Sequence, residues 1–161
     1  MSKKSSKAIP EGMHSITPVM YFNGNCRQAI DFYKKAFQAE IMGQIYPSPD
    51  GKSVWHAMIK IGNSNIMMSD VVPGSWEKGP EKSCTMSIWF YTEKCDEIYN
   101  NAVKNGCEAA MPIMDMFWGD RFGKLKDPFG HTWSLAAHQW DYTPEEMKQK
   151  EKEMMTQMQQ Q

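Results

Sequence analysis

The order of secondary structure can be worked out from the stretch Tyr21-Phe22-Asn23-Gly24-Asn25-Cys26, which is followed by Ala29-Ile30-Asp31-Phe32-Tyr33. It joins an apolar strand pattern, Ile16–Phe22, to a helix pattern through a turn of Asn and Gly residues. The helix pattern repeats apolar residues at three- and four-residue steps, which places them on one face. These residues are Cys26, Ala29, Ile30, Tyr33 and Phe37. Asn25 stands where a helix N-cap is expected, so a strand followed directly by a helix is predicted.

Three further strand patterns follow this helix. Turn residues separate them, among them Pro47-Ser48-Pro49-Asp50-Gly51 and Gly62-Asn63-Ser64. The expected strands are Ala39–Tyr46, Val54–Ile61 and Asn65–Asp70. The first part of the chain therefore predicts one strand, one helix and three strands, in that order.

The same order is repeated after the loop Pro73–Lys82, which is rich in Gly, Pro and charged residues. Thr92 can cap the second helix, and Gly106 lies just beyond it, where a left-handed conformation is expected. The apolar face of this helix is Cys95, Ile98, Tyr99, Ala102 and Val103. The expected strands are Cys84–Tyr91, Glu108–Met114, Gly123–Lys126 and Thr132–Ala137.

The repeated order predicts an α+β fold of tandem βαβββ modules that form a curved mixed sheet around a cavity. One helix covers only one face of a four-stranded sheet, so the other faces of two such units are expected to enclose a ligand-binding groove. The modules span about residues 15–72 and 83–138, within one domain of residues 15–138.

The two ends of the chain lie outside this domain. Residues 1–14 are polar and lack periodicity, which predicts a flexible N-terminal tail. Residues 139–161 are expected to form a C-terminal helical tail, because Thr143-Pro144-Glu145-Glu146 has the pattern of a capping box with Pro at the first helical position. Its thin stripe of methionines leaves two alternatives open: a solvated helix, or a helix whose first turns dock on its own domain or on a partner.

Composition argues against several classes of function. The 161 residues carry 18 Lys+Arg against 19 Asp+Glu, whereas a nucleic-acid binder needs an excess of positive charge on its binding surface. No apolar run is long enough to span a membrane, and the basic N-terminus lacks the apolar stretch of a secretory signal. We therefore expect a cytoplasmic protein that binds neither nucleic acid nor membrane and whose four cysteines are free thiols.

Five motifs resemble the vicinal oxygen chelate superfamily, which contains glyoxalases, bleomycin-resistance proteins and dioxygenases, and within it the PhnB-like branch. Phe117-Trp118-Gly119 and Asp127-Pro128-Phe129-Gly130 are specific in combination. The strand-to-helix stretch quoted above, Ile66-Met67-Met68-Ser69-Asp70 and Trp133 complete the match. The resemblance covers about residues 15–138 and implies paired βαβββ modules, usually completed as a homodimer.

The resemblance also implies where a metal would be bound. Enzymes of this superfamily hold a divalent metal with four His, Gln or Glu side chains, on the first and last strand of each module. The corresponding positions here are Pro18, Met67 or Met68, Ser87 and about Ser134. Proline has no side-chain donor, and Ser and Met are poor ligands for Zn²⁺, Mg²⁺, Mn²⁺ or Ni²⁺. We therefore expect no metal at this site, although a divalent metal held by other residues stays open.

Aromatic residues of the second module supply a candidate ligand-binding surface, with core packing as the alternative for Trp89. Trp118 lies beside Gly119 in a polar stretch, as aromatic residues at the rim of a cleft do. Arg121 can either clamp a carboxylate or phosphate or form an ion pair with Asp120. The expected ligand-binding residues are His56, Met68, Ser87, Trp89, Phe117, Trp118, Arg121 and Ser134.

Three functions are compatible with this sequence. We expect a homodimer that binds a small organic molecule in its cavity without a metal, as the resemblance to bleomycin-resistance proteins implies. The first alternative is a lyase-, isomerase- or dioxygenase-type enzyme on a small metabolite, with or without an unusual metal site. His56, otherwise a hydrogen-bonded histidine of the sheet, would then be the general base, and Arg121 would orient an anion. The second alternative is a partner-binding module that makes its contact through the C-terminal helix.

Overall fold

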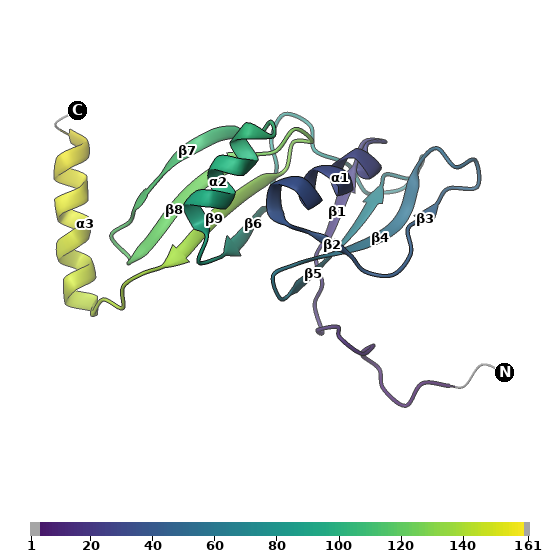
Figure 1. The fold of residues 1–161 in the computed structure, drawn as a ribbon, viewed down its shortest axis with the longest axis horizontal. Coiled ribbons are helices and arrows are strands. Elements are labelled where there is room, and N and C mark those ends of the chain that lie inside the picture. The colour runs from purple at the N-terminus through teal and green to yellow at the C-terminus, as the bar shows by residue number, and fades with distance from the viewer. Residues whose placement is uncertain (1–3, 160–161) are drawn as a thin grey trace. The chain divides into compact units, whose positions relative to one another are not determined.

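The computed structural model describes residues 4–159 and divides into two compact units, Met1–Gly79 and Pro80–Gln161 (Figure 1). Each unit contains a mixed sheet with a helix against it. The α+β class and the two βαβββ modules predicted from the sequence are thereby confirmed. None of the helices in this described part of the chain is long and apolar enough to cross a membrane.

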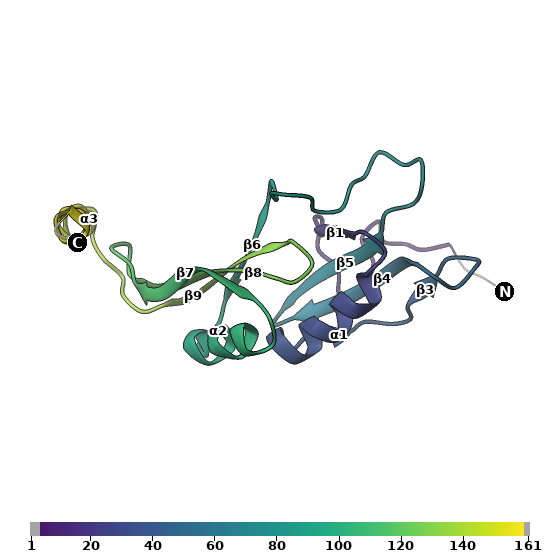
Figure 2. The same ribbon diagram turned by 90° about the horizontal axis from the view of Figure 1, so that it is seen from above.

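The first unit forms a sheet in the strand order β1-β5-β4-β2, with β3 also paired to β4. β1 and β5 are parallel neighbours, whereas β4 is antiparallel to its partners. Figure 2 shows α1 along one face of this sheet. The elements are β1 (Val19–Phe22), α1 (Cys26–Phe37), β2 (Glu40–Ile41), β3 (Tyr46–Pro47), β4 (Val54–Ile61) and β5 (Ser64–Asp70).

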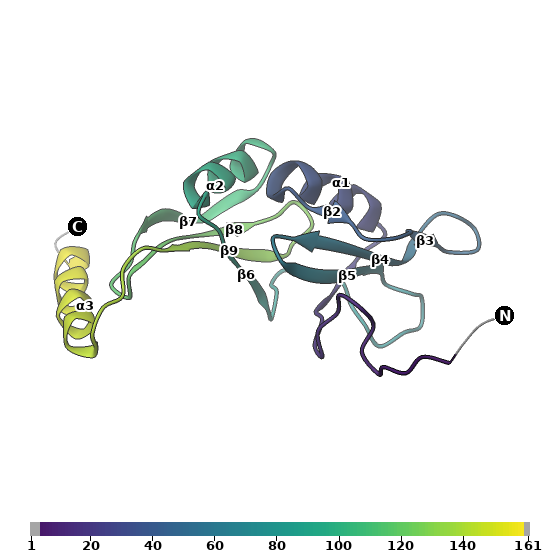
Figure 3. The ribbon, with the colours of Figure 1, turned by 60° about the horizontal axis from the view of Figure 1, so that its bottom comes forward.

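The second unit repeats this arrangement in the strand order β6-β9-β8-β7. Its first and last strands, β6 and β9, are again parallel neighbours, and the other pairs are antiparallel. Figure 3 shows α2 along one face of the sheet. The elements are β6 (Ser87–Tyr91), α2 (Cys95–Lys104), β7 (Glu108–Asp115), β8 (Asp120–Lys126) and β9 (Thr132–His138).

The largest difference from the predicted strands lies at residues 39–46. Two short strands, β2 and β3, replace the single strand expected there. Gly43 between them has a φ of 74°, which an extended strand does not adopt. The chain therefore bends at Gly43, and both strands pair with different parts of β4.

Three other strands begin three residues away from the expected position. β1 begins at Val19, although the carbonyl of Pro18 still accepts a hydrogen bond from the Met67 N–H at 2.9 Å. β6 begins at Ser87 rather than at Cys84. β8 is longer than predicted, because it already pairs with β9 at Asp120.

The buried helix faces follow the apolar spacing. All five predicted residues of α1 are buried, and the rings of Tyr33 and Phe37 stack 5.8 Å apart. Four of the five predicted residues of α2 are buried as well, whereas Val103 near its end is 38% exposed. Gly106 beyond this helix has a φ of 117°, a positive value as expected for its position.

Asn25 is the N-cap residue of α1, as predicted, whereas the predicted cap of α2 is wrong. The Asn25 side chain makes no capping hydrogen bond to α1, and Lys94 rather than Thr92 is the N-cap residue of α2. The helix α3 (Pro144–Gln159) has the predicted capping box, with the Thr143 N–H bonded to Glu146 Oε2 at 2.9 Å. The Glu146 N–H donates in turn to Thr143 Oγ1 at 3.2 Å. None of the described residues of α3 is buried, in agreement with the solvated alternative.

A buried carboxylate takes the capping role at α1. Asp70, at the end of β5, is 2% exposed. Its Oδ1 accepts a hydrogen bond from the Cys26 N–H at 2.9 Å, and its Oδ2 accepts one from the Val54 N–H at 2.8 Å. One side chain thus joins the first residue of α1 to the first residue of β4.

Replacing Asp70 by Asn should destabilise the first unit by about 2 kcal/mol, because one buried N–H would face an amide NH₂ instead of an oxygen. Unfolding in urea, followed by circular dichroism, measures the change. Asp31→Asn is the matched control, since Asp31 is an exposed residue of α1. Equal unfolding midpoints for the two variants would show that Asp70 does not hold these elements together.

Candidate ligand-binding site

The sheet of the second unit has one face against α2 and an opposite face, which we call the open face. Successive residues of a strand point to opposite faces. Arg121 faces α2, because it forms an ion pair with Asp96 of that helix. Asp120 and Phe122 therefore lie on the open face. Through the strand register this face also contains Ser87, Trp89 and Tyr91 of β6, Lys124 of β8, and Ser134, Ala136 and His138 of β9.

Aromatic rings gather at one end of the open face. Trp89 stacks on Phe122 with ring centroids 4.8 Å apart, and Trp118 meets Phe122 edge-on at 5.5 Å. We call the set Trp89, Tyr91, Phe117, Trp118 and Phe122 the aromatic platform. Phe122 is buried, whereas Trp89 is 46% exposed and Tyr91 is 57% exposed. A buried ring therefore supports rings that are accessible to a ligand.

The carboxylate of Asp120 holds the platform in place and is itself 2% exposed. Its Oδ2 accepts hydrogen bonds from the Tyr91 hydroxyl and from Trp118 Nε1, each at 2.9 Å. Its Oδ1 lies 2.7 Å from Nδ1 of His138. Burial and the bond to Asp120 raise the pKa of Tyr91, so this phenol keeps its proton and acts as a donor.

His138 has a carboxylate at each ring nitrogen. Besides the contact of Nδ1 with Asp120, its Nε2 lies 2.9 Å from Oδ1 of Asp141. The hydrogen bonds to Asp141 and then to Asp120 raise the pKa of His138, because both favour the doubly protonated ring. His138 therefore joins the platform to the segment that follows β9.

The turn before β8 is in contact with the segment that follows β9. Gly119 has a φ of 98°, and a side chain there would overlap the carbonyl oxygen of Trp140. The Gly119 carbonyl accepts hydrogen bonds from the N–H groups of Gln139 and Trp140, at 2.9 and 3.0 Å. The residue after Trp118 therefore anchors the main chain that leads into α3.

The four positions that correspond to metal ligands meet in two pairs, one in each unit. In the first unit, the Met67 N–H bonds to the Pro18 carbonyl, and Met67 is half-buried while Met68 is completely buried in the core. In the second unit, the hydroxyls of Ser87 and Ser134 lie 3.2 Å apart. The family spacing thus finds neighbouring positions but leaves Met67 and Met68 as alternatives. The structure separates them, because Met68 lies on the face of β5 that is against α1.

The residues at these positions do not fit a divalent metal. Two hydroxyls bonded to each other, a thioether and a proline offer neither an anionic donor nor an imidazole. Among the residues that the structure describes, no group of three or more His, Cys, Asp and Glu side chains could hold a metal ion. No chemical step can be derived through a metal at this site.

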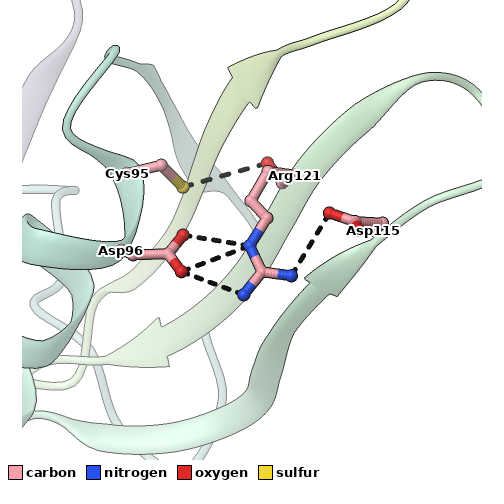
Figure 4. A network of polar contacts seen from close by, with 4 residues as sticks. All are labelled: Cys95, Asp96, Asp115 and Arg121. Carbon is pink, nitrogen blue, oxygen red and sulfur yellow. Dashed lines mark hydrogen bonds and ion pairs between the residues drawn. The ribbon is translucent and has the colours of Figure 1, made fainter.

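Arg121 lies on the opposite face of the sheet from the platform, and its guanidinium is already paired (Figure 4). Its Nη2 lies 2.9 Å from Oδ2 of Asp96, and its Nη1 lies 3.2 Å from Oδ1 of Asp115. The ion pair with Asp120 is therefore not formed, since neighbouring residues on a strand point to opposite faces. An open pocket of about 600 Å³ surrounds Arg121, but an anion would have to displace two carboxylates.

His56 lies in the first unit, on β4. Its side chain is exposed, and its ring centroid is 6.1 Å from that of Tyr46 on β3. Of the eight residues predicted to bind a ligand, the open face brings together Ser87, Trp89 and Ser134. Trp118 packs edge-on against Phe122 of this face, and Phe117 packs edge-on against Trp118. The other three are Arg121 on the opposite face and His56 and Met68 in the first unit.

The buried thiols are poor nucleophiles. Burial raises the pKa of Cys26 and of Cys107 to about 12, and that of Cys95 to about 11. Because the thiolate is the reactive form, these cysteines stay protonated and inert at neutral pH. The groups of the second unit that can act on a ligand are therefore its aromatic rings and its hydrogen-bonding side chains.

The native pKa of His138 should lie above the value of about 6.5 that is usual for histidine. Nuclear magnetic resonance of the ring protons measures it, and Asp141→Asn should lower it by removing the largest contribution. Glu145→Gln, a charge change at an exposed residue of α3, is the control. Because the folded state raises this pKa, the associated stability is present at low pH and is lost as the pH rises through the native value. An unchanged pKa in Asp141→Asn would contradict the role of Asp141.

The chain is similar in sequence to a known family and to individual proteins. The family model of the Glyoxalase/Bleomycin resistance protein/Dioxygenase superfamily matches residues 15–135. An uncharacterized protein of Mycobacterium bovis is 38% identical over 113 residues, which is 67% of this chain and 73% of that protein.

Solved structures show the same fold. A protein of Pseudomonas aeruginosa is 27% identical and superposes with a TM-score of 0.63, over 80% of this chain and all of that one. A PhnB protein of Bacillus cereus, named a putative 3-demethylubiquinone-9 3-methyltransferase, is 22% identical with a TM-score of 0.60. The match covers 77% of this chain and 99% of the Bacillus protein, and at this identity it shows the fold alone.

Proposed function

Because the chain belongs to the Glyoxalase/Bleomycin resistance protein/Dioxygenase superfamily, we propose that it binds a small organic molecule on its aromatic platform, without a metal ion. The observation that carries this proposal is the exposed ring of Trp89 stacked on the buried ring of Phe122. We further propose the PhnB-like branch, to which the fold of the Bacillus cereus protein gives limited support.

The platform is suited to binding because its rings are held before a ligand arrives. Tyr91 and Trp118 are both bonded to Asp120, and Trp118 also packs against Phe122. Ordering a side chain on binding costs about 0.5–1.5 kcal/mol, and a side chain that is already fixed avoids that cost. A flat organic molecule therefore gains stacking and apolar burial on Trp89 with little loss of side-chain freedom.

The residue types at the site are also compatible with binding alone. Sequestration needs no activated water, base or metal, whereas the family's metal positions here carry Pro, Met and two Ser residues. Among the candidates for the enzymatic alternative, Arg121 is neutralised by Asp96 and Asp115 on the other face of the sheet. No observation on the described residues favours that alternative over binding.

Trp89→Ala should weaken the binding of a neutral flat probe, naphthalene-2-methanol, by about tenfold, because one aromatic pair is worth roughly 0.5–1.5 kcal/mol beyond the area it buries. Isothermal titration calorimetry measures the affinity without relying on tryptophan fluorescence. Trp76→Ala is the control, since Trp76 is 97% exposed and lies in the first unit. If both variants bind the probe as the original protein does, the platform is not the ligand site.

We also propose that the protein is a homodimer. Large apolar side chains outside the platform are exposed in both units, including Trp55 at 49% and Trp140 at 62%, and a second copy would cover part of this surface. Light scattering after size-exclusion chromatography should give about twice the chain mass of 18.6 kDa. A mass near 18.6 kDa at all concentrations would contradict the dimer.

A further inference from the structure

Lys124 lies on the open face, in the same cross-strand row as Trp89, the exposed ring of the pair that Trp89 forms with Phe122. Lys124 of β8 is directly opposite Ser134 of β9, and Ser134 is directly opposite Trp89 of β6. Residues that are opposite one another across neighbouring strands point to the same face. Trp89, Ser134 and Lys124 therefore form one row, with an aromatic ring at one end, a small hydroxyl side chain in the middle and a cation at the other end.

The cation of this row has no counter-charge in the described part of the chain. Lys124 is exposed, and none of the ion pairs between described residues includes it. A lysine ammonium is a compact charge on a flexible stem, so it can move toward an anion that arrives beside it.

The carboxylate of Asp120 on the open face is already enclosed by hydrogen-bond donors. Asp120 accepts from Tyr91, from Trp118 and from His138, and it is buried beneath them. Asp141 is bonded to the other nitrogen of His138. The carboxylate of Asp120 beside the platform is therefore closed to a cationic ligand, whereas Lys124, at the end of the row away from Trp89, is accessible to an anionic one.

The spacing of the row fits one small molecule. Neighbouring strands lie about 4.8 Å apart, so the backbones of Trp89 and Lys124 are separated by two such spacings, about 9.6 Å. Ser134 between them has a short side chain that is itself buried, so it does not block a ligand from lying across the row. A fused aromatic ring on Trp89 would place a substituent on its far edge within reach of the lysine side chain.

We propose that the ligand class of this site is a planar aromatic anion, whose ring stacks on Trp89 and whose carboxylate or similar acidic group pairs with Lys124. This inference rests on the proposed function, since it names the ligand class of the same platform. It makes Lys124 a specificity-determining residue, which selects the charge of the ligand while the aromatic rings supply the stacking.

Three probes of the same ring size test the charge preference: 2-naphthoate, naphthalene-2-methanol and 2-naphthylmethylammonium. Calorimetry at low salt should give the tightest binding for the naphthoate, about two- to fivefold tighter than for the alcohol, with the ammonium weakest. This range is the fold-change that corresponds to an exposed charge pair of up to about 1 kcal/mol. Lys124→Gln should abolish the difference between naphthoate and alcohol but leave the affinity for the alcohol unchanged.

The controls separate this inference from the function on which it rests. Lys124→Arg should keep the preference for the anion, and Lys104→Gln, an exposed charge change on α2, should leave it unaltered. Equal binding of the three probes, lost in Trp89→Ala, would overturn the anionic ligand class but support the platform. Binding of none of the probes, or binding that Trp89→Ala does not weaken, would overturn the proposed function itself. A change of oligomeric mass in Lys124→Gln without a change in preference would assign the row to an interface with a second copy.

Discussion

A buried carboxylate is the constraint on which the candidate site depends. An ionised side chain that is removed from water is tolerated only where hydrogen-bond donors surround it. Asp120 meets this condition with donors from three places in the second unit: Tyr91 on β6, Trp118 in the turn before β8, and His138 at the end of β9. The position of the aromatic rings is therefore a consequence of keeping one carboxylate satisfied.

The same device recurs elsewhere in the fold. Asp70 joins the start of α1 to the start of β4 in the first unit. In the second unit, Asp127 is 4% exposed, and its Oδ1 accepts from the N–H groups of Phe129 and His131 at 2.9 Å. Its Oδ2 accepts from Nε1 of Trp133 at 2.8 Å. Each of these buried acids joins segments that apolar packing alone would leave free to slide, since hydrophobic contact has no direction.

Much of the architecture could be predicted from the sequence, because helix periodicity depends on spacing within a dozen residues. The buried faces of α1 and α2 were predicted almost completely, with Val103 as the exception. Strand starts were less predictable, since they depend on pairing with distant residues. The predicted start of β8 at Gly123 left residues 120–122 outside any strand. The alternation of side chains along β8, which places Arg121 on the opposite face from Asp120 and Phe122, could therefore not be predicted.

The site was predicted in part for the same reason. The positions of Ser87 and Ser134 follow from the family spacing, and the structure places their hydroxyls side by side. Tyr91, Asp120 and His138 were not predicted as site residues, because only the strand register brings these three together. A shift of one residue exchanges the two faces of a strand, which is why Met67 and Met68 stayed equivalent until the pairing of β5 was known.

Gly119 links the aromatic platform mechanically to the segment that leads into α3. Its carbonyl holds the main chain of Gln139 and Trp140, while the next residue toward the N-terminus is the indole that donates to Asp120. The main chain that leads into α3 and the Trp118 indole of the platform are thus both attached to Gly119, the first by hydrogen bonds and the second by a peptide bond. A load applied to that helix would be transmitted to the indole through these two hydrogen bonds and a few covalent bonds, without passing through the hydrophobic core.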